Sequence, residues 1–165
     1  MLDRLWAGWR GDYVATAGAD EGGGGCVFCR ILGSGAPDAE TLVLWRGERS
    51  FAVLNAYPYT SGHLMVMPYR HVGDLGALDE DEAHELFGGV RRASAAIQTA
   101  YEPDGMNVGM NLGRAAGAGI PGHLHVHVLP RWAGDTNFMT SVGEARVLPE
   151  MLRTAYAKLA AAWAT

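Results

Sequence analysis

Alternating polar and apolar positions mark one short segment of the chain, residues 123–130. Three histidines alternate there with three apolar residues: His123, Leu124, His125, Val126, His127 and Val128. A period of two is typical of a β-strand, so we expect the histidines to share one face and the apolar residues the other. The apolar face would then pack on a core, while the histidine face would look into a cleft that one ligand fills.

Hydrophobic periodicity also predicts the remaining elements. A long helix is expected after Asp79, which forms a capping-box pattern with Glu82. Its predicted core-facing stripe recurs at spacings of three and four: Ala83, Leu86, Phe87, Val90, Ser94, Ile97 and Tyr101. Shorter helices are expected at 26–32 and 148–163. Further strands are expected at 41–46, 50–54, 63–68 and 105–112.

The order of these elements predicts an α+β fold and not a chain of β-α-β units. Short turns join neighbouring strands, and such turns imply antiparallel pairing. We therefore expect an antiparallel sheet of about five strands with one long and one C-terminal helix. Residues 1–25 would form an aromatic arm and a glycine-rich linker, residues 26–147 the main domain, and residues 148–165 the C-terminal helix.

Composition limits the classes of function. A chain of 165 residues with 48% hydrophobic and 19% charged residues is expected to form one globular domain. The net charge of −5 argues against nucleic acid as a partner, because a basic surface is missing. No apolar run approaches the ~18 residues of a membrane span. The N-terminus also lacks the apolar core of a signal peptide, so a cytoplasmic location is expected.

The histidine segment supports two chemical hypotheses beside a purely structural one. Alternating histidines can chelate zinc, or the middle histidine can attack phosphorus while its neighbours contact the phosphate oxygens. The glycine-rich run before the segment favours the second hypothesis. Its glycines let backbone N–H groups approach an anion closely: Gly113, Gly117, Gly119 and Gly122. No carboxylate lies within residues 105–134 to repel a polyphosphate.

The sequence His-Leu-His-Val-His-Val-Leu-Pro at 123–130 resembles the signature of the histidine triad (HIT) superfamily. Further similarity lies at Cys26–Leu32, at Leu54-Asn55 with Pro58, and at 61–68, so that it spans residues 26–132 in order. Flanking motifs are similar to the bacterial diadenosine tetraphosphate phosphorylase branch: Leu5-Trp6, Trp9-Arg10, Tyr13, 54–59, 107–113, 130–132, Gly134-Asp135 and Asn137-Phe138.

The resemblance implies roles for the histidines. His125 would be the nucleophile that attacks the α-phosphate of a nucleotide and forms a nucleotidyl-histidine, which phosphate, water or another acceptor then releases. His127 and His123 would contact the phosphate or orient it. The implied activity is that of a nucleotidyl transferase or hydrolase acting on dinucleoside polyphosphates, with phosphorolysis of diadenosine tetraphosphate to ADP and ATP preferred.

The resemblance also implies a nucleotide-binding set. Asn55 matches the position near the ribose, and either Asn107 or Asn111 would contact ribose or phosphate. Gly117, Gly119 and Ile120 belong to the phosphate-facing loop. The family usually carries glutamine or serine where this chain has Gly119, so a backbone N–H of Gly119 or Ile120, or the side chain of Arg114, would substitute. Trp132 would stack on a base or anchor the end of the strand.

The pair Cys26 and Cys29 forms a CxxC motif with three possible uses. A redox pair would need a thioredoxin-like setting, which the pattern does not predict. Reduced cysteines can also pack as small hydrophobic groups. By resemblance to bacterial HIT proteins, the two cysteines with His71 and His123 would hold a structural zinc ion. His123 is thus claimed by both the zinc site and the triad.

Other functions remain open at the level of the sequence. Within the family, the alternatives are hydrolysis of dinucleoside polyphosphates or of adenosine phosphoramidates. A nucleotide-binding regulator with weak catalysis is a second class, suggested by Gly119. A zinc-dependent hydrolase is a third, disfavoured by the missing carboxylates. The resemblance also implies a homodimer, or a higher homo-oligomer.

Overall fold

The computed structural model describes residues 25–135 and 150–163. The predicted N-terminal arm and linker, apart from Gly25, lie outside the described residues, as do residues 136–149. The helices and strands follow one another as α2 (Val27–Gly33), α3 (Asp38–Thr41), β1 (Val43–Arg46), β2 (Ser50–Leu54), β3 (Leu64–Pro68), η2 (Leu75–Ala77), α4 (Glu80–Tyr101), β4 (Gly105–Gly109), η3 (Arg114–Ala116), β5 (Val126–Arg131) and α6 (Leu152–Trp163).

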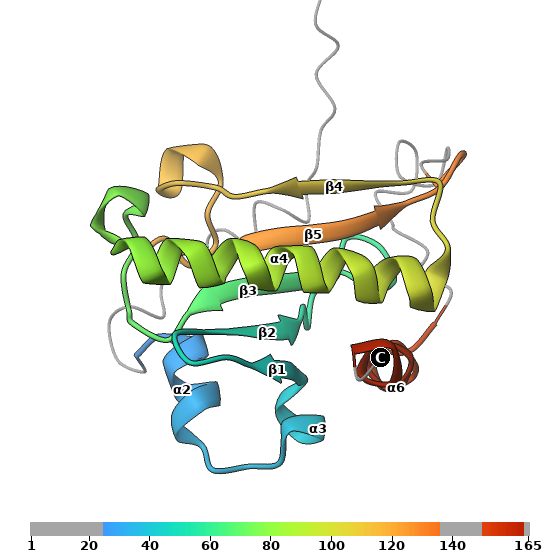
Figure 1. Cartoon of the computed structure of the whole chain (residues 1–165), viewed down its shortest axis with the longest axis horizontal. Coiled ribbons are helices and arrows are strands. Elements are labelled where there is room, and N and C mark those ends of the chain that lie inside the picture. Colours follow the sequence, from blue (N-terminus) through green and yellow to red (C-terminus); the bar gives the residue numbers. More distant parts are fainter. Residues whose placement is uncertain (1–24, 136–149, 164–165) are drawn as a thin grey trace, which may run out of the picture.

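The five strands form one antiparallel sheet in the order β1-β2-β3-β5-β4. This confirms the predicted α+β class. Helix α4 lies along one face of the sheet and contacts β2, β3 and β5, while α6 contacts α4 and β1 (Figure 1). The pairing of β3 with β5 sets Met65 opposite His127, so it brings the loop before β3 beside the histidine segment.

Two apolar clusters cover the two faces of the sheet. The larger one lies under α4 and α6, and the smaller one lies under α2. Every residue of β2 and β3 is buried, because both faces of these central strands are covered. Residues that alternate along β2 therefore belong to different clusters, as Ala52 and Val53 do.

The capping box that begins α4 is confirmed: the Asp79 carboxylate accepts from the Glu82 N–H, and Glu82 accepts from the Asp79 N–H. The predicted buried stripe is partly wrong, because Phe87 is 53% exposed. The buried residues of α4 are Glu82, Leu86, Gly89, Val90, Ala93, Ala96 and Ile97. This stripe is turned away from Phe87 toward Gly89, where a Cβ atom would lie only 2.8 Å from the Trp45 ring.

Several predicted boundaries need correction. The histidine strand β5 begins at Val126, so His123 and His125 precede it in an irregular segment. Strand β1 begins later than expected, because the short helix α3 takes residues 38–41. Strand β4 ends at Gly109 and not at residue 112. None of the helices in the described part of the chain is long and apolar enough to cross a membrane.

Candidate active site

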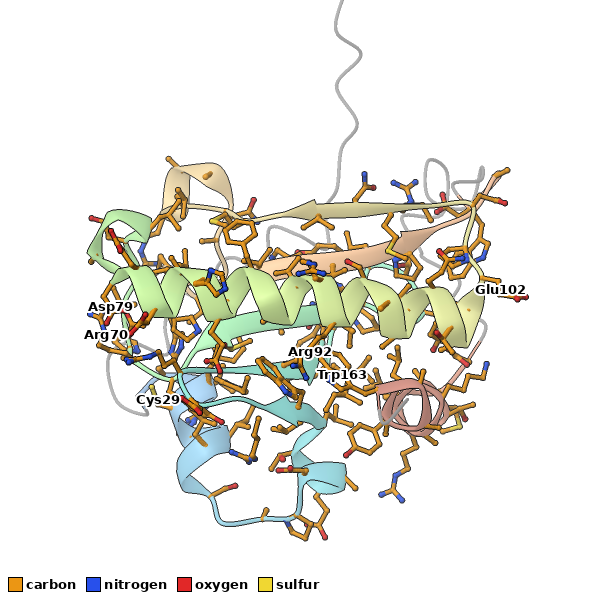
Figure 2. The ribbon with its side chains drawn as sticks, viewed as in Figure 1. Cys29, Arg70, Asp79, Arg92, Glu102 and Trp163 are labelled. Atoms are coloured by element: carbon orange, nitrogen blue, oxygen red, sulfur yellow. The ribbon has the colours of Figure 1, made fainter. Side chains whose placement is uncertain are left out.

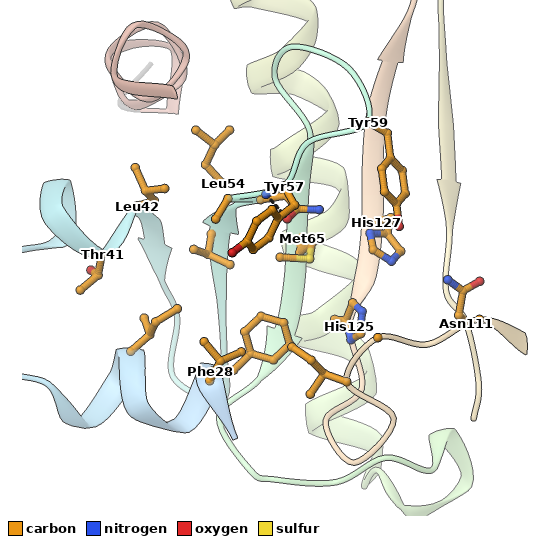
Figure 3. Close-up of a pocket in the computed structure, with 18 residues that line it drawn as sticks. Phe28, Thr41, Leu42, Leu54, Tyr57, Tyr59, Met65, Asn111, His125 and His127 are labelled. Atoms are coloured by element: carbon orange, nitrogen blue, oxygen red, sulfur yellow. Dashed lines mark hydrogen bonds between the residues drawn. The ribbon is translucent and has the colours of Figure 1, made fainter. Parts of the chain in front are cut away.

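A cavity of about 410 Å³ opens on the sheet face that carries α2. Its walls come from α2, the ends of β2 and β5, and the glycine-rich loop (Figure 3). Seven of the residues singled out from the sequence border it: Asn55, Asn111, Gly117, Gly119, Ile120, His125 and His127. The lining contains no carboxylate, as the sequence of the loop predicts. His123, Asn107 and Trp132 do not belong to the lining.

His125 has its side-chain protonation fixed by the backbone. Its Nδ1 lies 2.8 Å from the carbonyl oxygen of His123. Because a carbonyl can only accept, Nδ1 carries the proton and donates it, which leaves the lone pair on Nε2. Burial lowers the pKa of His125, so the neutral ring predominates near pH 7. His125 therefore has an unprotonated nitrogen available as a nucleophile.

A fourth histidine, His63, fixes the opposite tautomer at His127. The backbone N–H of Tyr59 donates to Nδ1 of His63 at 3.1 Å. Nδ1 of His63 is therefore unprotonated, and its Nε2–H donates to Nδ1 of His127 across 2.9 Å. In neutral His127 the proton then sits on Nε2. The rings of His125 and His127 meet edge to face at 4.9 Å, so a lone pair and a donor N–H are presented side by side.

His63 lies in the segment 61–68 that resembles the family, but no role was predicted for it from the sequence. His63 is fully buried, a position that a lone histidine seldom takes without a partner. A signal was present in the sequence, since His63 directly precedes the apolar run 64–67, which forms a buried strand in the structure. Its partner could not be inferred, because the pairing of β3 with β5 joins segments that lie far apart along the chain.

Asn55 connects the cavity to this histidine pair. Its side-chain oxygen accepts from the Tyr57 N–H at 3.0 Å, so its Nδ2 group faces His63 Nδ1 at 3.1 Å. The two candidate asparagines differ in position, since Asn107 lies in β4 and Asn111 follows it. Asn111 borders the cavity, whereas the Asn107 side chain accepts from Arg131 at 2.7 Å on the strand.

Trp132 lies at the end of β5, and its ring meets that of Tyr101 edge to face at 6.1 Å. Its backbone N–H and the Arg131 guanidinium both donate to Asp135. These contacts favour the anchoring role that the sequence left open beside base stacking.

The glycine-rich loop folds around the 3₁₀ helix η3. Its conformation needs glycine at Gly113 and Gly117, which have φ angles of 79° and 91°. Gly119 and Ile120 border the cavity without offering a polar side chain. Within the described residues, no hydrogen bond uses the N–H groups of these two residues, so both donors are available to an anion.

Four potential metal ligands meet beside the cavity: Cys26, Cys29, His71 and His123. One ligand atom from each lies within 4.8 Å of all the others. Sulfur atoms of both cysteines lie 3.4 and 3.7 Å from His123 Nδ1, and Cys29 Sγ lies 3.5 Å from His71 Nδ1. Neither cysteine forms a disulfide. The four residues named from the sequence are therefore brought together and could bind a metal ion.

The hydrogen bonds of His123 suit a metal ligand. Its Nε2–H donates to the Pro68 carbonyl at 2.9 Å, which leaves Nδ1 unprotonated and turned toward the sulfur atoms. Metal-bound histidines commonly use their second ring nitrogen in this way. Two sulfur and two nitrogen donors match a tetrahedral zinc site, whose ligand atoms lie roughly 3.3 to 3.8 Å apart.

Comparisons with known proteins agree with this geometry. A family model described as the HIT domain matches residues 36–134. A protein of Mycobacterium tuberculosis named AP-4-A phosphorylase is 43% identical over 167 aligned positions, which cover 99% of this chain and 86% of that protein.

Solved structures show the same fold. A hypothetical histidine triad nucleotide-binding protein from Sulfolobus tokodaii superposes with a TM-score of 0.68 at 29% identity, covering 84% of this chain and 92% of its own. A Zn-bound histidine triad family protein from Mycobacterium smegmatis also superposes with a TM-score of 0.68, at 28% identity. The match covers 84% of this chain and 93% of that protein.

Proposed function

The chain belongs to the HIT domain family, and on that premise we propose that it cleaves dinucleoside polyphosphates through a covalent nucleotidyl group on His125. The preferred reaction is phosphorolysis of diadenosine tetraphosphate, which consumes inorganic phosphate and yields ADP and ATP. The observation that carries the proposal is the opposite protonation of His125 and His127 at one cavity. The name of the Mycobacterium tuberculosis relative supports the choice of substrate.

In the first step, the Nε2 lone pair of His125 attacks the α-phosphorus of diadenosine tetraphosphate. A nitrogen–phosphorus bond forms, the bond from that phosphorus to its bridging oxygen breaks, and ATP leaves. The Nε2–H of His127 donates to the phosphate oxygens, where negative charge gathers. His63 holds His127 in the tautomer that can donate.

In the second step, an oxygen of inorganic phosphate attacks the same phosphorus. The nitrogen–phosphorus bond breaks, ADP leaves, and His125 regains its lone pair. Two displacements thus replace one, which is the usual gain of covalent catalysis. Water in place of phosphate would give AMP and ATP.

The cavity offers contacts for the rest of the nucleotide. Its lining is mainly apolar, with Phe28 on one wall, and suits an adenine ring. Asn55 and Asn111 are placed to contact the ribose or a phosphate. The N–H groups of Gly119 and Ile120 would replace the side-chain donor that the family usually has at residue 119.

We assign Cys26, Cys29, His71 and His123 to a structural zinc ion, supported by their spacing and by the Zn-bound neighbour. The ion would supply a fixed link between α2 and the histidine segment. His123 then serves the metal, and His125 and His127 carry the chemistry. Metal analysis of freshly purified protein should find about one zinc per chain.

A nucleotide-binding regulator with weak catalysis is the second candidate, favoured by the lack of a donor side chain at Gly119. For the assembly we propose a homodimer that pairs through the sheet edge β4. Reduced thiols at Cys26 and Cys29 suit a cytoplasmic location.

The test is incubation with diadenosine tetraphosphate, with and without inorganic phosphate. We expect ADP and ATP only when phosphate is present. AMP and ATP in both conditions would identify a hydrolase instead, and AMP binding without turnover would identify the regulator. The variant His125→Ala should lose turnover, and turnover that survived it would exclude the covalent route.

A further inference from the structure

The metal cluster and the nucleotide cavity share one short segment of chain. Cys26 and Cys29 are ligands of the cluster, and they enclose Val27 and Phe28, which border the cavity together with Ile31. The helix α2 that carries these residues has only seven residues. The position of its cavity-facing side chains therefore depends on what holds the two cysteines as well as on apolar packing against the sheet.

Phe28 is the residue that contacts both sites. Its ring centroid lies 5.4 Å from the ring of His123 and 5.4 Å from the ring of His125. It is 3% exposed, so neighbours enclose it on every side. A shift of α2 would move this ring relative to both histidines.

The backbone adds a second connection. The His123 ring faces the sulfur atoms, while the His123 carbonyl accepts the hydrogen bond that orients His125. One residue therefore fixes the cluster through its side chain and the nucleophile through its main chain.

We propose that Phe28 is a positioning residue that couples metal binding at the four-ligand cluster to nucleotide binding in the cavity. With the ligands drawn together, α2 and Phe28 are held in the arrangement that closes the cavity wall. Without the metal, the two cysteines keep only weak sulfur–imidazole contacts, and α2 is held by the apolar packing of Phe28 and its neighbours alone. The metal and the nucleotide then favour the same position of α2, so binding of either one raises the affinity of the protein for the other.

This coupling rests on the proposed nucleotide-binding function. It adds to that function a measurable factor, by which bound metal changes the AMP affinity. Thermodynamic linkage requires that metal change the AMP affinity by the same factor as AMP changes the metal affinity. Coupling between sites commonly amounts to about 5- to 150-fold, and we expect about tenfold here because only one wall of the cavity is involved.

The experiment measures the effect of zinc on AMP affinity and the effect of AMP on zinc affinity. It uses the full chain with the thiols kept reduced. AMP is titrated into zinc-loaded and into chelator-stripped protein, and zinc affinity is measured by chelator competition with and without AMP. Circular dichroism checks that the stripped protein keeps its helices. We expect about tenfold tighter AMP binding with zinc, and the same factor in the competition assay.

A pair of matched variants separates positioning from general packing. Phe28→Leu should retain zinc and reduce the coupling factor toward one. Phe51→Leu is the control, because Phe51 lies in the same apolar cluster but stacks on Tyr69 and does not border the cavity. It should leave the coupling factor unchanged.

The outcomes are distinct. Equal AMP affinity with and without zinc would overturn the coupling, and equal loss of coupling in both variants would overturn the positioning role of Phe28. Either result would leave the proposed function intact. A loaded protein that binds no AMP would overturn the proposed function, and the coupling with it.

Discussion

The two adjacent imidazoles of His125 and His127 differ in protonation because different groups hold their protons, and the roles proposed for them follow from this difference. A backbone carbonyl holds the proton of His125 on Nδ1, and His63 leaves the proton of His127 on Nε2. The tautomer of His63 depends in turn on the Tyr59 N–H. A chain of hydrogen bonds thus runs from the loop after β2 to the reacting side of the cavity.

The variant His63→Phe tests this chain of hydrogen bonds. It keeps a ring of similar size but removes the donor to His127, so the His127 proton is no longer held on Nε2. We expect kcat to fall on the order of 10²-fold, with little change in AMP affinity. His84→Phe on the exposed side of α4 is the control and should keep full activity. An unchanged kcat in the His63 variant would exclude the role of His63.

The two asparagines after α4 provide a second test of single residues. Asn111 borders the cavity and Asn107 bonds Arg131, so only Asn111 is placed to contact the nucleotide. We expect Asn111→Ala to weaken AMP binding by about 3- to 10-fold, the value of one hydrogen bond. Asn107→Ala should leave AMP binding almost unchanged, as calorimetric titration can show. The reverse order would contradict the placement.

At the scale of elements, the N-terminus of α4 is the site with a clear pH dependence. Figure 2 labels Arg70 and Asp79 at this end of the helix. Arg70 pairs with Glu82, which also accepts from the Asp79 N–H, and both contacts lower the pKa of Glu82 to about 2 from 4.5. Because the folded pKa is the lower one, the stabilisation is complete above about pH 4.5 and is lost as the pH falls toward 2.

The variant Glu82→Gln should therefore destabilise the protein at pH 7 and much less at pH 3. We expect about 1 kcal/mol at pH 7, the usual worth of a partly exposed ion pair, because solvent reaches Arg70 and the glutamine oxygen can still accept from the Asp79 N–H. Urea unfolding at the two pH values measures the difference. A loss that did not shrink at low pH would show that charge on Glu82 contributes nothing.

The capping box of α4 was predicted correctly because capping depends on residues three apart in one helix. The buried stripe was harder to predict. Whether Phe87 or Gly89 is buried depends on the position of Trp45, which packs against the helix from the sheet. Hydrophobicity alone places Phe87 inside. Packing against Trp45 leaves room only for glycine on that side.

The residues of the candidate site also fall into two groups, those that a local sequence pattern predicts and those that it does not. His125 and the four cluster residues were predicted from motifs, and the structure brings the cluster together. His63 was missed, and the choice between Asn107 and Asn111 was left open. These questions depend on which strand lies beside which, and on the direction of a loop, neither of which a local pattern specifies.

At the scale of the whole molecule, β4 is an edge strand whose outer side has no partner among the described strands. Val108 on this strand is 50% exposed. An exposed edge with an apolar side chain is a surface that a second sheet can extend. It supports the proposed homodimer, whose contact would then lie on the side of the sheet away from β1.

The variant Val108→Lys should shift the protein from dimer toward monomer, because a charge would be buried at the shared edge. Sedimentation velocity measures the change directly. Met151→Lys is the control, since Met151 is 77% exposed next to α6, which packs near β1. A wild-type monomer, or two variants with the same mass, would remove β4 from the assembly.

The central claim is that the reaction passes through a nucleotide bonded to His125. The most direct measurement mixes protein with diadenosine tetraphosphate without phosphate, quenches within the first turnover, and maps adducts by mass spectrometry. We predict one AMP group on the peptide that contains His125, and its release as ADP when phosphate is added to a parallel sample before the quench. Absence of the adduct in protein that turns over normally once phosphate is supplied, or an adduct on another residue, would contradict the account.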